Sequence, residues 1–222
     1  MVYGAASEIV TLTHSDGTSY EIPTASNGVS STSTRIVTGT YTISASVSNF
    51  SGSVTVTTST TRINAWPAGA TIYYWYGYAP LGDFASAKAV PSDSDYTSNP
   101  TGMQITTGEN SVFVKTYGNA ARGGTAYLPE TTVNGSTLYL VCSGTVNHNS
   151  ATAALKLVVT SSISNKYNAA VKANITEGKS LVTASISSIS GGSYYVGITG
   201  NTSVASVGTK QTSTTVKAIY SI

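Results

Sequence analysis

Apolar residues alternate with serine and threonine along most of this 222-residue chain, and that period of two limits the folds open to it. In residues 40–47 every second side chain carries a hydroxyl, and the side chains between them are apolar. Successive side chains of a β-strand point to opposite faces, so this pattern predicts strands with one buried and one exposed face. No stretch of helical length shows a convincing period of 3.6. The chain is therefore expected to be all-β.

The surface of such a fold has to be covered by hydroxyl groups, because charged residues are scarce. Serine and threonine supply 69 residues, while Asp, Glu, Lys and Arg make up 9% of the chain, against roughly 25% in an ordinary soluble domain. A hydrophobic content of 40% with 15 tyrosines indicates a folded chain. Eleven basic against nine acidic residues exclude a stripe that neutralises nucleic-acid phosphates. No apolar run is long enough for membrane insertion.

Residues 1–70 are predicted to form a small β-sandwich of immunoglobulin-like or transthyretin-like type. Short alternating runs recur there between turn signals such as Asp16-Gly17, at the spacing of such sandwiches. The six expected strands are residues 9–14, 19–23, 34–37, 40–47, 53–57 and 62–66.

Residues 71–109 are predicted to hold an aromatic strand and a long connector. The densest aromatic segment of the chain is 71–78, and the following residues 79–108 contain three of the six prolines and little strand pattern. Loops of this length are uncommon and are often functional.

Residues 110–222 are predicted to form an eight-stranded jelly-roll β-sandwich, so the fold class is two β-sandwich domains in sequence. The eight expected strands are residues 111–117, 125–128, 136–146, 153–161, 167–174, 180–186, 193–199 and 214–222.

Four aromatic residues are candidates for contact with a ligand or a partner: Tyr73, Trp75, Tyr78 and Tyr195. The apolar face of a sugar can lie on an aromatic ring, and Tyr and Trp also anchor protein interfaces. The alternative is that these rings fill a core or an inter-subunit contact. Both interpretations stay open at this stage.

The chain shows no catalytic motif, and we expect it not to be an enzyme. It has neither a Gly-x-Ser-x-Gly elbow nor a phosphate-binding glycine loop. His14 and His148 stand beside turn residues and are interpreted as solvated loop histidines. A glycosidase would need two carboxylates at a set separation, for which Glu109 and Glu130 are one candidate pair.

The other candidate acids are Asp93 and Asp95, which with Asn99 place oxygen atoms at alternate positions, as calcium loops do. The segment lacks the central glycine and the distant bidentate glutamate of such loops. Asp and Ser are also ordinary turn residues, so we expect no metal and no cofactor.

The cellular compartment is only partly readable. Cys142 lies in an apolar run and has no second cysteine to pair with, which favours a buried, inert thiol. Residues 1–8 lack the basic start and the apolar core of a signal peptide. The expectation is a protein made in a cytoplasm and locked into an assembly.

Four segments resemble tail-fibre and other minor virion proteins of tailed bacteriophages: residues 39–43, 54–56, 72–77 and 186–198. The resemblance implies an immunoglobulin-like module followed by a jelly roll akin to carbohydrate-binding modules. It also implies a virion surface protein that adheres to host-surface glycans. It transfers no specific sugar-contacting residue.

The leading hypothesis is a bacteriophage virion structural protein, either a tail or fibre module or a capsid-surface decoration. Its partners would be other virion proteins, a host-surface glycan and copies of itself, possibly as a trimer. Charged side chains on edge strands normally prevent two sheets from pairing edge to edge, and a weakly charged sandwich has few of them. The alternatives are a cell-surface adhesin or filament subunit, which needs an export signal, and a glycan-degrading enzyme.

Overall fold

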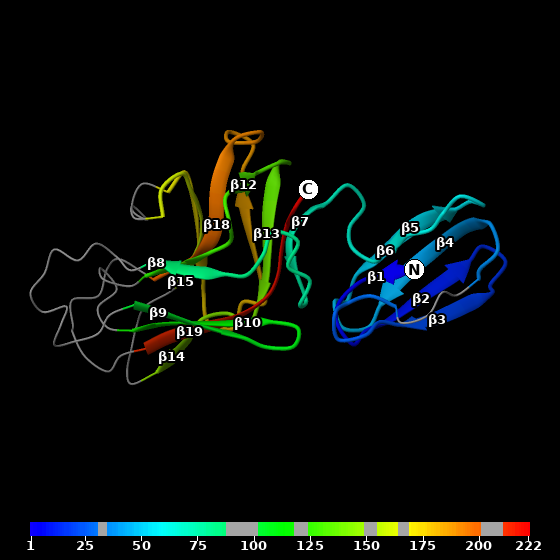
Figure 1. Cartoon of the computed structure of the whole chain (residues 1–222), viewed down its shortest axis with the longest axis horizontal. Helices are drawn as coiled ribbons and strands as arrows, with labels where there is room; N and C mark the ends of the chain where they lie inside the picture. Colours follow the sequence, from blue (N-terminus) through cyan, green and yellow to red (C-terminus); the bar gives the residue numbers. More distant parts are fainter. Residues whose placement is uncertain (31–34, 88–101, 118–123, 149–154, 164–168, 201–210) are drawn as a thin grey trace, which may run out of the picture.

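The computed structural model shows two lobes side by side along the long axis of the molecule (Figure 1). It describes residues 1–30, 35–87, 102–117, 124–148, 155–163, 169–200 and 211–222. Every regular element in these ranges is a β-strand, so the all-β prediction is confirmed. Within the same ranges no helix is present that could cross a membrane. Strands β1 to β6 make up the N-terminal lobe, and β7 to β19 make up the C-terminal sandwich.

The N-terminal lobe stacks two sheets on each other. A four-stranded antiparallel sheet has the order β3-β2-β4-β5, and β1 pairs with β6 in a short parallel sheet. The Asp16-Gly17 signal does close the β2–β3 hairpin, with Gly17 at a φ of 92°. The strands are β1 (Val2–Tyr3), β2 (Ile9–His14), β3 (Ser19–Pro23), β4 (Gly39–Ala45), β5 (Ser51–Val56) and β6 (Ile63–Asn64).

The alternation in sequence becomes the two faces of this sheet. In β4, Tyr41, Ile43 and Ala45 are buried while Thr42 and Ser44 are exposed. The buried side chains of β2, β4 and β5 pack with those of β1 and β6 in one apolar cluster. The lobe is therefore a small sandwich with its own core.

The C-terminal sandwich has a seven-stranded sheet in the order β17-β13-β19-β10-β9, with β14 and β7 also paired to β19. The aromatic strand β7 thus belongs to this sheet rather than to a connector. The strands are β7 (Thr71–Trp75), β9 (Gly102–Thr107), β10 (Val112–Tyr117), β13 (Thr137–Cys142), β14 (Val146–His148), β17 (Leu181–Ser185) and β19 (Gln211–Ser221).

The facing sheet has six strands in the order β16-β15-β18-β11-β8, with β12 paired to β18. The inward side chains of both sheets form one large apolar core, which includes Leu138, Leu157 and Ile198 at 0% exposure. The strands are β8 (Ala85–Ala87), β11 (Thr125–Tyr127), β12 (Thr131–Thr132), β15 (Leu155–Thr160), β16 (Val171–Ile175) and β18 (Ser193–Thr199).

Each of the eight strands expected in residues 110–222 has a counterpart, although residues 153–154 and 167–168 lie outside the described ranges. The expected strand 136–146 ends at Cys142, because Gly144 turns the chain with a φ of 76° before β14 begins. Cys142 itself is 2% exposed, and burial raises the pKa of its thiol, which confirms the buried cysteine.

Two expectations about local structure were wrong. Residues 35–37, expected in a strand, lie outside any strand. Ile36 packs on the N-terminal core from a loop, and the Val37 carbonyl oxygen accepts the Tyr41 hydroxyl (2.9 Å), so these contacts with the core need no pairing to a neighbouring strand. The stretch 79–109 is not a strandless connector either, because β8 and β9 lie within it and pair with β11 and β10.

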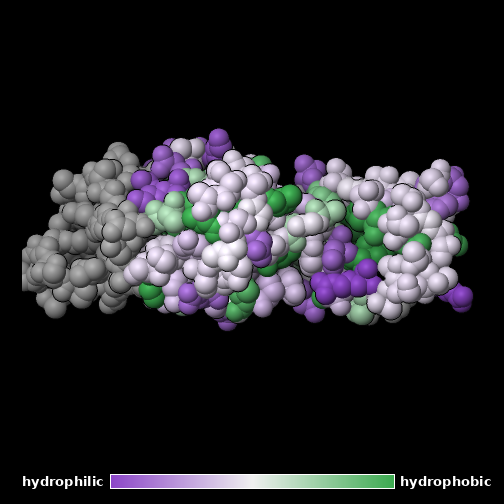
Figure 2. Space-filling model, turned by 90° about the horizontal axis from the view of Figure 1, so that it is seen from above, coloured by the Kyte–Doolittle hydropathy of each residue, from purple (hydrophilic) through white to green (hydrophobic). Residues whose placement is uncertain are grey.

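The surface carries little charge, as the composition requires. Figure 2 shows one face of the molecule, on which most atoms are pale, the hydropathy range of Ser, Thr and Gly, with only scattered hydrophilic and hydrophobic patches. In β4 the hydroxyl side chains Thr40, Thr42 and Ser44 are the exposed ones.

Candidate binding site

The two lobes meet where the loop after β1 contacts the turn after β7. The Ala6 N–H donates to the Tyr76 carbonyl oxygen (3.2 Å), and the Tyr76 N–H donates to the Lys217 carbonyl oxygen on β19 (2.7 Å). Ala5, Trp75, Tyr76 and Ala218 form a separate buried cluster at this contact. Tyr76 therefore links the N-terminal loop to the central strand of the larger sheet.

A groove of about 440 Å³ opens beside this contact, and we call it the junction groove. The turn after β4 forms one lip, and the ends of β13, β17 and β19 form the other. The exposed apolar side chains Val47 (46%) and Leu181 (45%) belong to opposite lips. Its lining consists of Val47, Ser48, Asn49, Phe50, Ser51, Pro67, Trp75, Tyr76, Val141, Cys142, Ser180, Leu181, Lys217 and Tyr220.

Buried Glu8 holds the N-terminal lip in place. Its Oε1 accepts hydrogen bonds from Val47 N (3.0 Å), Ser48 N (2.7 Å) and Ser48 Oγ (2.7 Å). Its Oε2 accepts one from Ala5 N (2.8 Å), and the residue is 1% exposed. A carboxylate that accepts several N–H donors is a strong acceptor, so one side chain joins the lip to the loop that contacts Tyr76.

Aromatic rings form the floor of the groove. Trp75 and Tyr76 are 3% and 5% exposed, and the Trp75 ring meets the rings of Tyr76 (5.3 Å) and Tyr220 (5.5 Å) edge to face. Tyr220 is half-buried and stacks on Tyr139 with ring centroids 4.9 Å apart. Burial, aided by the nearby charge of Glu8, raises the pKa of Tyr76 to about 12, so its hydroxyl is neutral at physiological pH.

The floor and the lip of the groove also contain residues with a left-handed backbone conformation. Among the described residues, three non-glycine residues have a left-handed φ: Ser7 (52°), Asn49 (51°) and Tyr76 (42°). Asn49 and Tyr76 line the groove, and Ser7 lies in the loop that contacts it. Asparagine adopts this region readily in turns, whereas for most other residues such backbone costs of order 1–3 kcal/mol and clusters at functional sites. A bulky residue such as Tyr76 at positive φ is a clear outlier.

A second feature that lowers the stability of the fold is the buried indole N–H of Trp75. Its Nε1 is buried and has no hydrogen-bond acceptor among the described residues. The rings of Trp66, Tyr76 and Tyr220 surround it edge to face, which leaves at most a weak N–H···π contact. The floor is therefore not arranged for stability alone.

The sequence-predicted candidates do not converge on one site. Tyr73 is 1% exposed and packs in the core of the C-terminal sandwich. Its hydroxyl oxygen lies 3.0 Å from Ser221 Oγ and accepts the Asn134 N–H (3.1 Å). Tyr73 is thus packed in the core between the sheets, which agrees with the alternative that these rings fill a core.

Trp75 and Tyr78 both lie at the junction. Their backbone groups exchange two hydrogen bonds (2.9 and 2.7 Å), which places Tyr78 back beside Trp75 after the Tyr76-Gly77 turn. Tyr78 is half-buried and stacks on Trp66 with centroids 5.9 Å apart. Trp75 lines the junction groove and Tyr78 does not.

Tyr195 lies on the other sheet of the sandwich. Its ring meets Tyr127 edge to face at 5.6 Å, and its hydroxyl donates to Glu130 Oε2 over a long 3.5 Å. Glu130 Oε1 also accepts from Ser193 Oγ (3.1 Å). This is a half-buried polar and aromatic patch rather than a groove.

The structure also places the candidate catalytic acids and metal ligands. Glu130 follows β11 of the six-stranded sheet, whereas Glu109 lies in the β9–β10 turn of the seven-stranded sheet. Asp93, Asp95 and Asn99 lie outside the described residues. No group of three or more metal-ligating side chains is found in the part of the chain that the structure describes.

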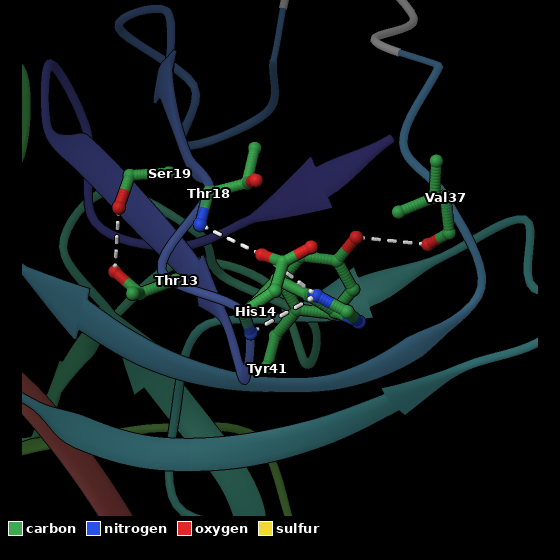
Figure 3. Close-up of polar contacts among 7 residues, drawn as sticks. Thr13, His14, Thr18, Ser19, Val37 and Tyr41 are labelled. Atoms are coloured by element: carbon green, nitrogen blue, oxygen red, sulfur yellow. Dashed lines mark hydrogen bonds and ion pairs between the residues drawn. The ribbon is translucent and has the colours of Figure 1, made fainter.

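His14 is packed rather than solvated, which corrects the sequence interpretation. Figure 3 shows its imidazole against the ring of Tyr41. Nδ1 lies 3.0 Å from Asp16 Oδ1, the ring centroids of His14 and Tyr41 are 4.9 Å apart, and the side chain is 16% exposed. His148 ends β14, and its side chain lies outside the described part of the chain.

The Asp16 carboxylate makes the stability of the hairpin depend on pH. The Thr18 N–H (2.8 Å), and then His14, hold the pKa of Asp16 at about 2, below its ordinary 3.8. Because the folded-state pKa is lowered, this contribution is present above pH ~4 and is lost as pH falls toward ~2. We expect the melting temperature of wild type to fall more steeply between pH 4 and 2 than that of Asp16→Asn, measured by circular dichroism. Parallel curves would contradict this assignment.

Sequence reasoning missed most of the groove. Asn49 was visible as part of a turn cluster, but a turn signal does not say what the turn faces. Glu8, Lys217 and Tyr220 carry no local signal, because their roles depend on contacts across the junction.

Comparison with known proteins gives no family. No protein-family model matches the chain, and no curated protein matches it. One solved structure to which the chain is similar comes from a study of the promiscuous specificity of carbohydrate-binding modules of the β-sandwich superfamily. The alignment covers 98% of this chain and 86% of that chain, with 15% identity and a TM-score of 0.42. The class that the chain's own strands define is an all-β protein built from two sandwiches.

Proposed function

We propose that this chain is a non-catalytic carbohydrate-binding protein and that its ligand lies in the junction groove. The observation that carries the proposal is the coincidence of a concave aromatic floor with strained backbone at Tyr76. Strain is retained where the surrounding structure over-determines it, and binding sites are the usual reason.

The lining suits a sugar better than a purely apolar ligand. Tyr220 offers a half-exposed ring for the apolar face of a pyranose, and Ser51, Ser180 and Asn49 offer hydroxyl and amide groups for its hydroxyls. The volume of about 440 Å³ lies within the usual range of ligand pockets.

Tyr220→Ala is expected to weaken glycan binding by about 10- to 100-fold, because it removes the half-exposed ring of the floor. The measurement is a glycan-array screen followed by isothermal titration with the strongest ligand found. Circular dichroism checks that the variant is folded.

Tyr195→Ala is the matched control, since it removes another half-buried tyrosine from the opposite sheet. Unchanged affinity in that variant supports the junction groove. Loss of binding in Tyr195→Ala with none in Tyr220→Ala would move the site to the Tyr127–Tyr195 patch. Cleaved glycan in the same incubation, detected by mass spectrometry, would overturn the non-catalytic assignment.

As part of the same proposal, the protein acts in adhesion on a tailed-phage virion, as a tail or fibre module or a capsid decoration. What supports this is the resemblance of its strand motifs and a hydroxyl-rich surface. Charged residues or prolines on an edge strand normally prevent it from pairing with a strand of another molecule. The edge strand β5 contains neither. Light scattering at high protein concentration should detect a homo-oligomer. A stable monomer that does not bind virions would leave carbohydrate binding standing but remove the virion role.

A further inference from the structure

Lys217 occupies an irregular position on β19, where it borders the junction groove. Along the β13–β19 ladder, Val141 pairs with Ala218 and Cys142 pairs with Val216, so Lys217 is an extra residue without a partner on β13. Its carbonyl oxygen accepts the Tyr76 N–H instead. A β-bulge of this kind changes the direction of a side chain and is common beside functional sites.

The bulge gives the groove a single charge. Among the residues that line it, Lys217 is the one basic side chain, and none is a carboxylate. Lys217 is exposed and forms no ion pair with a carboxylate in the described part of the chain. Glu8, which holds the lip, has both carboxylate oxygens occupied by N–H and O–H donors.

We infer that the junction groove selects carbohydrates that carry a carboxylate, with the Lys217 ammonium contacting the acid and the Tyr220 ring contacting the sugar. This inference rests on the proposed function. A neutral sugar offers the exposed ammonium no charged acceptor, whereas an acidic sugar adds a charge-assisted hydrogen bond at the edge of an aromatic floor. Lysine suits this role because its ammonium is a compact charge on a flexible stem.

The test compares acidic sugars with neutral partners of the same ring structure. The probes are oligogalacturonate against its methyl ester, and sialyllactose against lactose, titrated into the full-length protein. At least one acidic member should bind about tenfold more tightly than its neutral partner. That preference should shrink as salt is raised, because an exposed ion pair is screened.

Lys217→Gln should bring the acidic sugar to the affinity of its neutral partner, and Lys217→Arg should keep most of the preference. Lys156→Gln, on the six-stranded sheet, is the control for a general loss of positive charge and should change nothing. Equal binding of acidic and neutral sugars, with loss in Tyr220→Ala, would overturn this inference and leave the proposed function intact. Absence of binding by every probe and by the glycan array would overturn both. A sulfated galactan that binds in place of the carboxylate sugars would also overturn the carboxylate assignment.

Discussion

Glu8→Gln is expected to lower the free energy of unfolding by about 2–4 kcal/mol, although the two side chains are nearly the same size. Glu8 accepts from Val47 N, Ser48 N and Ser48 Oγ on one oxygen and from Ala5 N on the other. An amide has one acceptor oxygen, so its NH₂ group must face an N–H or O–H donor in a buried place. At least one buried donor is then left unsatisfied, and the charge-assisted bonds become neutral ones.

The same substitution should weaken glycan binding, because Glu8 holds the lip that carries Val47 and Asn49. Urea unfolding followed by circular dichroism measures the stability, and titration with the array ligand measures the affinity. Glu21→Gln is the control, since Glu21 is exposed on the edge strand β3 and should change neither quantity. A Glu8→Gln variant as stable as wild type would show that the carboxylate does not hold the lip.

Gly197→Ala is expected to cost about 3 kcal/mol or more, or to prevent folding. A Cβ at this position on β18 would lie 2.2 Å from the Ala126 carbonyl oxygen and 2.9 Å from the Tyr127 Cα. Both atoms belong to the backbone of β11, which pairs with β18 through Gly197 and Tyr127. Backbone cannot rotate away as a side chain can, so β11 would have to leave the ladder and take the buried Ala126 out of the core.

Gly178→Ala separates this steric effect from a general cost of replacing glycine. Gly178 has a φ of 69° and no atom within 4 Å of the added Cβ. Its cost should stay near 1 kcal/mol, which is the backbone term alone. Similar urea midpoints for the two variants would contradict the close approach of β11 to β18.

Much of the strand pattern was readable without coordinates. Alternation in residues 40–47 does become the buried and exposed faces of β4, and Asp16-Gly17 does close a hairpin. Both depend on local chemistry: the side-chain period of a strand is two, and glycine accepts positive φ in a tight turn. The same local rules misread residues 35–37, where a short apolar pattern packs on the core from a loop.

The aromatic candidates show the limit of such rules. Tyr73 and Trp75 share one strand, yet Tyr73 enters the core between the sheets while Trp75 faces the N-terminal lobe. Tyr220 lies 145 or more residues away along the chain and meets Trp75 because β7 pairs with β19.

The sequence by itself determined the all-β class, most of the strands and the hydroxyl-covered surface, because each follows from a residue and its immediate neighbours. The tertiary structure decided which aromatic rings remain within reach of a ligand, how buried Glu8 ties the lip to the loop, and why Lys217 borders the groove. Those features depend on pairing between distant strands and on the contact between two lobes. No local pattern of residues records such contacts.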